Sequence, residues 1–314
     1  MARLAAFLLC VVLMAAGCAP VTASLGSARV RPRITGDHFT TRDGLVLPLR
    51  HWDAETPRAI IVALHGMSDY SRAFEMPAPY WAKEGITTYA YDQRGFGQSP
   101  NPGVWPGAEA MRRDLSDCIS AVRVRHPGLP VYALGESMGG AVVLTSLTGQ
   151  SPLLLDGVIL VAPAVWSRAD MPFYYRAALW LTAHTVPWMT VSGKGLKIWP
   201  SDNIEMLREN ARDPLFQKQT RADAVWGLVN LMDEARQAPA KLQSTPPLLM
   251  LYGEKDQIIP RGPTEAVVKE LGAKAEVHVY PKGYHMLLRD LNGALAWKDI
   301  VSFIDRTKAS PSLH

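Results

Sequence analysis

The chain has 314 residues, of which 48% are hydrophobic and 20% are charged, and its formal net charge is +4 at pH 7. This composition is that of an ordinary globular protein, with ample length to bury a core. The net charge is small for this length and forms no basic block, which argues against nucleic acid as a partner.

The first 17 residues have the pattern of a secretory signal peptide. Arg3 is the only charged residue before Arg29, and the apolar run from Leu4 to Met14 ends in small residues. That run is too short to span a bilayer. We therefore expect residues 1–17 to be a signal peptide of the lipoprotein type and residues 18–36 to form an extended tether.

The small residues directly before Cys18 resemble the lipobox of bacterial lipoproteins, in which the cysteine becomes the lipidated N-terminus. The match is partial, because Ala15 stands where leucine is commonest. We predict that Cys18 is lipidated and, since Ala19 rather than aspartate follows it, that the protein is held at the outer membrane of a bacterial cell envelope. The alternative is ordinary cleavage after Ala23, which would release a soluble periplasmic protein.

After the tether, apolar runs alternate with helical patterns. A hairpin is expected over Phe39–Trp52. The expected helices are Glu109–Arg125, Ala141–Leu147, Glu265–Leu271 and Leu295–Arg306, and the expected strands are Ile60–Leu64, Thr87–Tyr91, Val131–Leu134, Val158–Ala162, Leu248–Tyr252 and Glu276–Tyr280. This alternation predicts an α/β fold with a mainly parallel sheet covered on both faces, and a ligand site at the carboxyl ends of the strands.

Residues 165–242 interrupt this alternation and hold five of the nine tryptophans. We expect them to form a helical cap inserted between two parts of the core, residues 37–164 and 243–308. Between Asp170 and Lys194 the only fixed charge is Arg176. A helix that is apolar on nearly all sides is buried or faces lipid. The hypotheses are that part of the cap lines an acyl tunnel and contacts a membrane, or that it only packs on the core.

The most informative motif is Gly135-Glu136-Ser137-Met138-Gly139, which lies between an expected strand and an expected helix. This is the context of the G-x-S-x-G nucleophile elbow, a sharp turn that needs glycine two residues before and two residues after the serine. The serine then lies at a helix N-terminus, which favours a developing negative charge. Ser137 is therefore the predicted nucleophile.

A serine nucleophile needs a base, and the base needs an orienting acid, in the chain order Ser, Asp or Glu, His for this type of elbow. Asp256 follows the strand Leu248–Tyr252, and His285 follows the strand Glu276–Tyr280. These are the predicted acid and base. Glu254 and Asp233 are the competing acids.

An oxyanion hole requires two backbone N–H donors. Met138, directly after the nucleophile, is the first predicted donor, and Met67 in the loop after an early strand is the second. His65 precedes Ser137 in the chain, so we interpret it as loop scaffolding. His278 alternates within its strand and is interpreted as structural. The sequence contains no metal-ligand cluster and no dinucleotide or phosphate motif, so neither a metal nor a cofactor is expected.

Together the segments His65–Met67, Tyr91–Ser99 and Gly135–Gly140, the turn at Asp256 and the pair Tyr284-His285 resemble the monoacylglycerol lipase and lysophospholipase branch of the α/β-hydrolases. The resemblance spans roughly residues 40–306. It implies an α/β-hydrolase fold, with the triad of that family at Ser137, Asp256 and His285 and its oxyanion donors at Met67 and Met138. Glu136 stands where many animal relatives carry histidine and plant-like relatives carry glutamate.

The sequence thus predicts a serine hydrolase of carboxylic esters that acts on lipid-like substrates such as monoacylglycerols or lysophospholipids. The predicted membrane contacts are the N-terminal lipid anchor and the cap. The alternatives are a small-ester carboxylesterase, a thioesterase or a peptidase on the same fold, or a non-catalytic binding lipoprotein. The sequence does not predict the oligomeric state.

Overall fold

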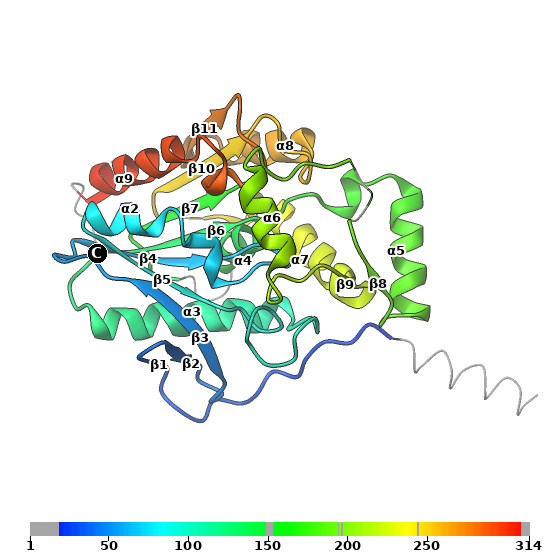
Figure 1. Cartoon of the computed structure of the whole chain (residues 1–314), viewed down its shortest axis with the longest axis horizontal. Helices are drawn as coiled ribbons and strands as arrows, with labels where there is room; N and C mark the ends of the chain where they lie inside the picture. Colours follow the sequence, from blue (N-terminus) through cyan, green and yellow to red (C-terminus); the bar gives the residue numbers. More distant parts are fainter. Residues whose placement is uncertain (1–18, 149–152, 194, 196, 244, 309–314) are drawn as a thin grey trace, which may run out of the picture.

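The computed structural model describes residues 19–148, 153–193, 195, 197–243 and 245–308 (Figure 1). The expected signal peptide and Cys18 lie outside the described residues. The predictions made for them are therefore not addressed by the fold.

A single sheet of nine strands forms the centre of the described chain, in the order β1-β2-β3-β5-β4-β6-β7-β10-β11. The strands from β5 to β11 in this order pair in parallel, and β1, β2 and β3 add an antiparallel edge. Their bounds are β1 Arg33–Thr35, β2 His38–Thr40, β3 Val46–Trp52, β4 Ala59–Leu64, β5 Ile86–Tyr91, β6 Val131–Glu136, β7 Gly157–Val161, β10 Leu248–Gly253 and β11 Ala275–Tyr280.

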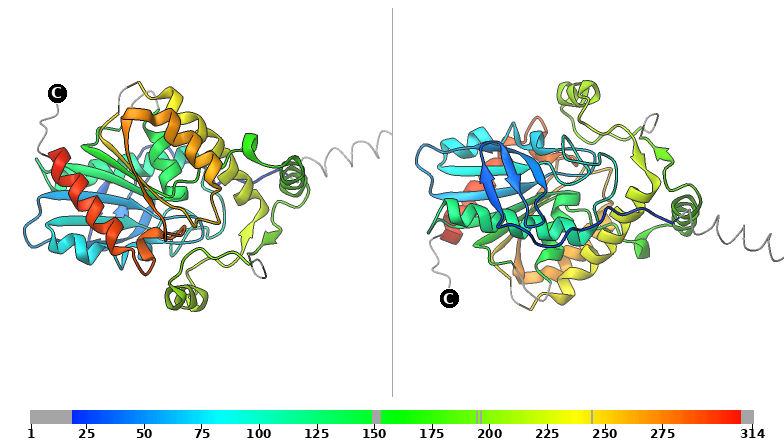
Figure 2. Two further views of the ribbon diagram at one scale, coloured as in Figure 1. Left: turned by 90° about the horizontal axis from the view of Figure 1, so that it is seen from above. Right: turned by 90° about the horizontal axis from the view of Figure 1, so that it is seen from below.

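Helices cover both faces of this sheet (Figures 1 and 2). One face carries α3 (Ala108–Arg125), α4 (Met138–Ser146), α7 (Ala222–Lys241) and α8 (Arg261–Leu271), and the other carries α2 (Ala78–Lys83) and α9 (Ala294–Lys308). Every residue of β4 is buried, because its side chains alternate between two apolar layers. Such continuous apolar strands are typical of parallel sheets covered on both sides. The predicted α/β-hydrolase architecture is confirmed.

The chain between β7 and β10 contains α5 (Phe173–Thr185), α6 (Ile204–Arg212) and α7, together with a small ribbon of β8 (Thr190–Val191) and β9 (Thr220–Arg221). α7 packs against α4 and α8 and contributes to the core. α5 packs on α7 and lies at the outer edge of the molecule, away from the sheet (Figure 1). Of the side chains of α5, only Ala183 is buried.

The segment predicted as an extended tether is docked on the core. The Ala23 N–H donates to the Trp105 carbonyl at 2.9 Å, and the N–H groups of Arg29 and Val30 donate to the Arg42 carbonyl at 2.7 and 3.0 Å. Strand β1, which was not predicted, pairs with β2. The extended backbone thus finds hydrogen-bond partners in core loops, as backbone groups at a protein surface tend to do. Figure 1 and the right view of Figure 2 show this segment running along the body toward one end of α5.

Candidate active site

Ser137 lies in a tight turn between β6 and α4, with φ of 54° and ψ of −115°. A positive φ is strained for a residue with a side chain and is found at sites that hold a group in a fixed position. The two glycines are needed for space. A Cβ atom on Gly135 would lie 2.3 Å from the Gly139 carbonyl oxygen, and one on Gly139 would lie 2.2 Å from that of Leu64.

The structure brings Ser137, His285 and Asp256 into one hydrogen-bonded chain. His285 Nε2 lies 2.9 Å from Ser137 Oγ, and His285 Nδ1 lies 2.8 Å from Asp256 Oδ2. Because the carboxylate can only accept, Nδ1–H donates to Asp256, and Nε2 is left to accept from the serine hydroxyl. Each residue follows a different strand, and the carboxyl ends of β6, β10 and β11 meet at the same edge of the sheet.

Asp256 is oriented by its own turn. Its Oδ1 atom accepts hydrogen bonds from the backbone N–H groups of Ile258 at 2.8 Å and Ile259 at 3.0 Å, which leaves Oδ2 for His285. Burial alone would lower the pKa of His285, but the Asp256 carboxylate reverses this, and the net shift is upward from the ordinary value. The imidazole is therefore a stronger base than a free histidine.

The competing residues lie elsewhere or have other partners. Glu254 is exposed in the same turn as Asp256. Asp233 forms an ion pair with Arg168 within the chain between β7 and β10. His278 lies between Glu276 at 2.8 Å and Asp299 at 3.0 Å on the far strand of the sheet. None of these three residues is hydrogen-bonded to Ser137 or His285.

The loop after β4 lies against the nucleophile. A Cβ atom on Gly66 would lie 3.2 Å from Ser137 Cβ, so the backbone approaches the serine closely there. This places the peptide that carries the Met67 N–H next to Ser137, while Met138 is the first residue of α4. His65 supports this loop through hydrogen bonds to Gln93. It is fully buried, and its Nε2 accepts from the Gln93 N–H at 3.0 Å.

A buried ion cluster not foreseen from the sequence connects the loop after β4, the turn at Ser137 and the loop that carries His285. Arg289 Nη2 lies 2.6 Å from Asp69 Oδ2 and 3.3 Å from Glu136 Oε2, and all three residues are at most 5% exposed. Asp69 follows Met67 in the loop after β4, Glu136 precedes Ser137, and Arg289 follows His285. Each lies close to a predicted motif in sequence, and only the fold pairs them. Burial raises the pKa of Glu136 and Arg289 opposes that rise.

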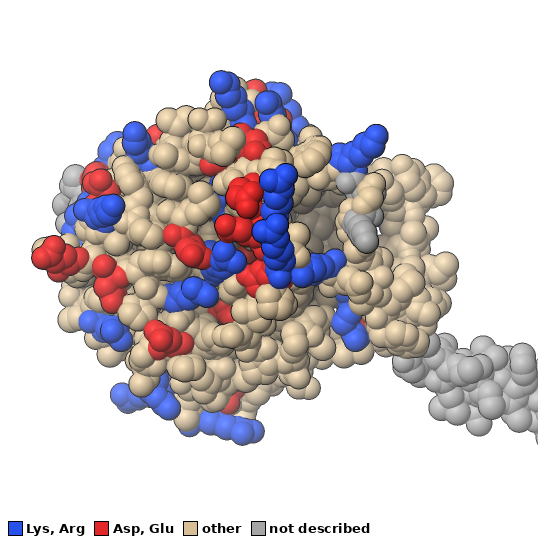
Figure 3. Space-filling model, in the orientation of Figure 1, with Lys and Arg blue, Asp and Glu red and all other residues tan. Residues whose placement is uncertain are grey.

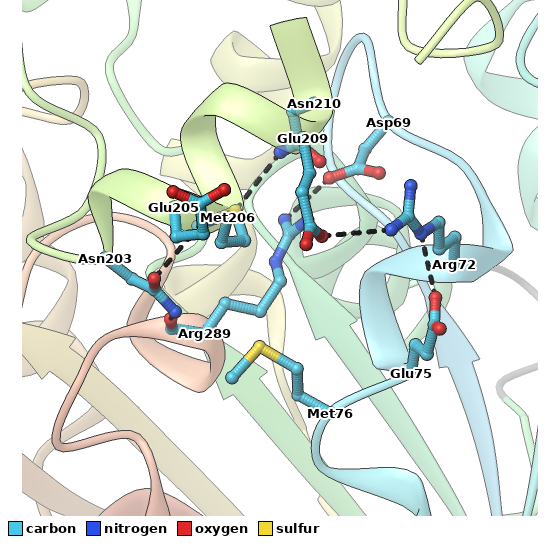
Figure 4. Close-up of a pocket in the computed structure, with 10 residues that line it drawn as sticks. All are labelled: Asp69, Arg72, Glu75, Met76, Asn203, Glu205, Met206, Glu209, Asn210 and Arg289. Carbon is cyan, nitrogen blue, oxygen red and sulfur yellow. Dashed lines mark hydrogen bonds and ion pairs between the residues drawn. The ribbon is translucent and has the colours of Figure 1, made fainter. Parts of the chain in front are cut away.

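Asp69 and Arg289 also line a polar pocket of about 440 Å³ between the loop after β4 and α6 (Figure 4). Most of its lining side chains are charged or carry an amide. The lining residues are Asp69, Arg72, Glu75, Met76, Asn203, Glu205, Met206, Glu209, Asn210 and Arg289. Arg72 closes one side through ion pairs with Glu75 and Glu209. The pocket is therefore suited to a polar group and is joined to the nucleophile turn through Glu136.

An apolar patch lies on and beside α5. It comprises side chains that are each more than half exposed: Phe173, Tyr174, Tyr175, Trp180, Leu181 and Trp188. In Figure 3, the lobe to which α5 belongs shows few charged side chains on the visible face, whereas charges of both signs crowd the rest. An exposed apolar surface of this kind marks a contact with another molecule or with a membrane.

Across the part of the chain that the structure describes, no group of three or more His, Cys, Asp or Glu side chains could hold a metal ion. Over the same residues, none of the helices has the length and apolar character needed to cross a membrane.

Comparison with known proteins gives a consistent result. The protein-family model described as "Serine aminopeptidase, S33" matches residues 55–292. The chain is 28% identical over 264 residues to a monoacylglycerol lipase of Mycolicibacterium smegmatis, covering 81% of this chain and 90% of the relative. It is 26% identical over 266 residues to human monoglyceride lipase, covering 81% and 84% of the two chains. The structure of a soluble variant of monoglyceride lipase from Saccharomyces cerevisiae superposes with a TM-score of 0.72 at 16% identity, covering 92% and 98%, which shows a shared fold.

Proposed function

Because the chain belongs to the serine aminopeptidase S33 family, in the monoacylglycerol lipase-like branch of the α/β-hydrolases, we propose that it hydrolyses carboxylic esters of lipids through Ser137, His285 and Asp256. The observation that carries this proposal is the hydrogen-bonded chain from Ser137 Oγ through the imidazole of His285 to the Asp256 carboxylate. That arrangement is the constellation by which serine hydrolases are recognised.

In the proposed reaction, Ser137 Oγ attacks the ester carbonyl while His285 Nε2 takes its proton. The N–H groups of Met67 and Met138 stabilise the negative oxygen of the tetrahedral intermediate. The imidazolium then gives its proton to the departing alcohol, and the acyl group remains on Ser137. A water molecule, deprotonated by His285, hydrolyses this acyl-enzyme to the free carboxylate and regenerates the serine.

Two surface features support an amphipathic substrate. The polar pocket lined by Asp69 and Arg289, of which Arg289 pairs with Glu136, suits a hydroxylated alcohol such as glycerol. The apolar patch at α5 suits a lipid phase. The relatives from Mycolicibacterium smegmatis and human, each of which aligns with 81% of this chain, are named a monoacylglycerol lipase and a monoglyceride lipase. A monoacylglycerol, with lysophospholipid as the related choice, is the proposed substrate. A small-ester carboxylesterase, a thioesterase, a peptidase and a non-catalytic binding protein are the competing functions.

A substrate panel with the purified full chain in detergent tests this proposal. We expect release of fatty acid from monoacylglycerols, with kcat/KM rising over part of a series from two to eighteen carbons, since each buried CH₂ contributes about 0.8 kcal/mol. Acyl-thioesters and amino-acid anilides should react far more slowly. Preferred cleavage of acetyl esters, thioesters or anilides would replace the lipase function with the corresponding alternative.

Ser137→Ala is the matched negative control. We expect it to lose about 10⁴- to 10⁶-fold in kcat and all labelling by a fluorophosphonate, because the three residues act as a unit. Circular dichroism should show an intact fold, since the serine hydroxyl makes no packing contact that alanine cannot keep. Labelling that persists in Ser137→Ala would assign the nucleophile to another residue.

We further propose that the protein works at a membrane, held by a lipid on Cys18 and in contact through the apolar patch at α5. The small residues before Cys18 support the first part. The exposure of Trp180 and Trp188, at 55% and 57%, supports the second. One lipid chain binds a membrane only marginally, so a second contact strengthens the attachment.

A further inference from the structure

The segment that follows α6 contacts the loop on which the proposed oxyanion donor Met67 lies. The Gln217 N–H donates to the Ser68 carbonyl at 2.8 Å. The Gln217 side-chain amide donates to the Gly95 carbonyl at 2.5 Å. Gly95 belongs to the same turn as Gln93, which supports His65 from the other side. Gln217 therefore joins two loops that flank the predicted oxyanion hole.

Ser68 has a backbone conformation that needs outside support. Its φ is 71°, in the left-handed region that residues with a Cβ atom seldom adopt. Such a conformation costs on the order of 1–3 kcal/mol and persists where surrounding contacts hold it. Because Ser68 directly follows Met67, its backbone angles set the course of the loop past Ser137. The hydrogen bond from Gln217 acts on the carbonyl of this strained residue.

A second contact holds the other flank of the same loop. Asp213 Oδ2 accepts from the Tyr70 hydroxyl at 2.6 Å and lies 2.9 Å from Arg72 Nη1. Asp213 Oδ1 accepts from the Leu215 N–H at 2.9 Å, which fixes the carboxylate within its own segment. The Asp213 side chain is only 8% exposed, so its charged hydrogen bonds are weakly screened by water. Residues 213–217 are thus hydrogen-bonded to the loop after β4 at Ser68 and at Tyr70.

On the core side, the same loop is held by the pairing of Asp69 with Arg289 and by the support that Gln93 gives His65. The loop therefore lies between a core support and a support from the chain between β7 and β10. A deviation of about 1 Å at a catalytic hydrogen-bond donor is enough to reduce a rate strongly.

We propose that Asp213 and Gln217 are positioning residues that hold the Met67 N–H where it can stabilise the oxyanion at Ser137. The inference rests on the proposed function, because an oxyanion has meaning only for an acyl-transfer reaction. Under this proposal, the segment after α6 affects the rate of the chemical step, whether or not it also covers the bound substrate. Loss of either residue should therefore lower kcat more than it raises KM.

The test uses the full chain and monobutyrin, a short soluble ester that needs neither a membrane nor a long acyl site. We expect Asp213→Ala and Gln217→Ala each to lower kcat by roughly tenfold, less than the 10²- to 10³-fold typical of deleting a donor, with KM changed less than twofold. Asp213→Asn, which can still accept from Tyr70, should recover part of the loss. Tyr70→Phe should reproduce the effect of Asp213→Ala in part.

Gln219→Ala is the matched control. Gln219 is exposed two residues further along, and its side chain accepts from Thr190 rather than from the loop after β4. This variant should keep the wild-type kcat. The wild-type rate on monobutyrin tests the proposed function independently of every variant.

A tetrahedral analogue separates positioning from a general structural effect. A boronic acid that forms an adduct with Ser137 should bind Asp213→Ala and Gln217→Ala more weakly, by about the factor lost from kcat/KM. A non-reactive ether analogue of monobutyrin should bind all variants alike. Unchanged kcat in both alanine variants, or an equal loss of ether and boronate affinity, would overturn the positioning role while leaving the proposed hydrolysis in place.

Discussion

Glu136 is a buried carboxylate next to the nucleophile, and its charge acts on His285. Together with Asp256 it raises the pKa of the imidazole, whereas Arg289 lowers it. In the proposed mechanism, His285 must be neutral to accept the proton of Ser137, so kcat/KM is expected to rise with pH through the pKa of this histidine. A negative charge at Glu136 therefore moves the acidic limb of the pH profile upward.

We expect Glu136→Gln to shift that limb to lower pH by about 0.5–1 pH unit, because the amide keeps the shape and removes the charge. The measurement is the pH profile of kcat/KM on a soluble ester. Glu254→Gln is the control, since Glu254 is exposed and its charge is screened by solvent. A limb that stays in place or moves upward in Glu136→Gln would contradict the electrostatic coupling.

At the scale of elements, the nucleophile turn depends on the close approach of α4 to the end of β4. A Cβ atom on Gly139 would lie 2.2 Å from the Leu64 carbonyl oxygen, and neither backbone can move without displacing the other. We expect Gly139→Ala to lower the free energy of unfolding by about 3 kcal/mol and to abolish activity. Denaturant unfolding and esterase assays measure the two effects.

Gly262→Ala is the matched substitution in a helix. No heavy atom lies within 4 Å of the position that its Cβ would take. Gly262 belongs to α8, where alanine is the better helix former. This change should stabilise the protein by about 0.4–1 kcal/mol. Comparable losses in both variants would show that space at Gly139 is not the deciding factor.

The tryptophans at α5 provide a second prediction at this scale. Trp180→Ala combined with Trp188→Ala should weaken binding to anionic lipid vesicles by roughly tenfold or more, because both side chains lose apolar area available for burial. Turnover of monobutyrin in solution should not change. The control is Val124→Ala, an 84% exposed apolar residue on α3.

Vesicle co-sedimentation with the lipidated N-terminus removed measures this contact separately from the anchor. A loss that grows with acyl length on monomeric esters would instead place these tryptophans in an acyl-binding site. Equal vesicle binding by wild type and the double variant would exclude the apolar patch as a membrane contact.

Elements with a strong local pattern were predicted within one or two residues. The continuous apolar strands β4, β5, β6, β7 and β10 and the amphipathic helix α3 are examples, because burial on both faces or on one stripe leaves a periodic signal. Strand β1 was missed, since three residues are too few to give a periodic signal and they become a strand only by pairing with β2. The docking of residues 23–30 was missed for the same reason.

Some residues of the candidate site could be predicted from the sequence and others could not. Ser137, Asp256 and His285 each follow a recognisable strand, so the fold brings together residues that the sequence had already singled out. Arg289 and Glu136 are 153 residues apart in the chain, and no local pattern pairs them. Gln217 and Asp213 lie in an irregular segment whose contacts come entirely from tertiary structure. Long-range polar contacts of this kind have no periodicity from which to predict them.

For the whole molecule, the prediction concerns the N-terminus. Mass spectrometry of the mature protein from bacterial membranes should show a first residue Cys18 carrying a diacylglyceryl group and an amide-linked acyl chain. Cys18→Ser should then move the protein from the membrane to the soluble fraction. An unmodified N-terminus at Ser24 would establish ordinary cleavage and a periplasmic enzyme.

The docking of the N-terminal segment determines how far such an anchor can reach. Hydrogen bonding to the core begins at Ala23, and the five peptide units between Cys18 and Ala23 span at most about 18 Å. A linker this short would hold the folded domain at an effective concentration in the millimolar range relative to the membrane that carries the anchor. The first described residues also lie beside α5 (Figures 1 and 2). The linker to the anchor and the apolar patch are therefore on the same side of the folded domain. A lipidated enzyme of this geometry would take its substrates from the leaflet to which it is attached. It would be unable to reach lipids in an opposing membrane.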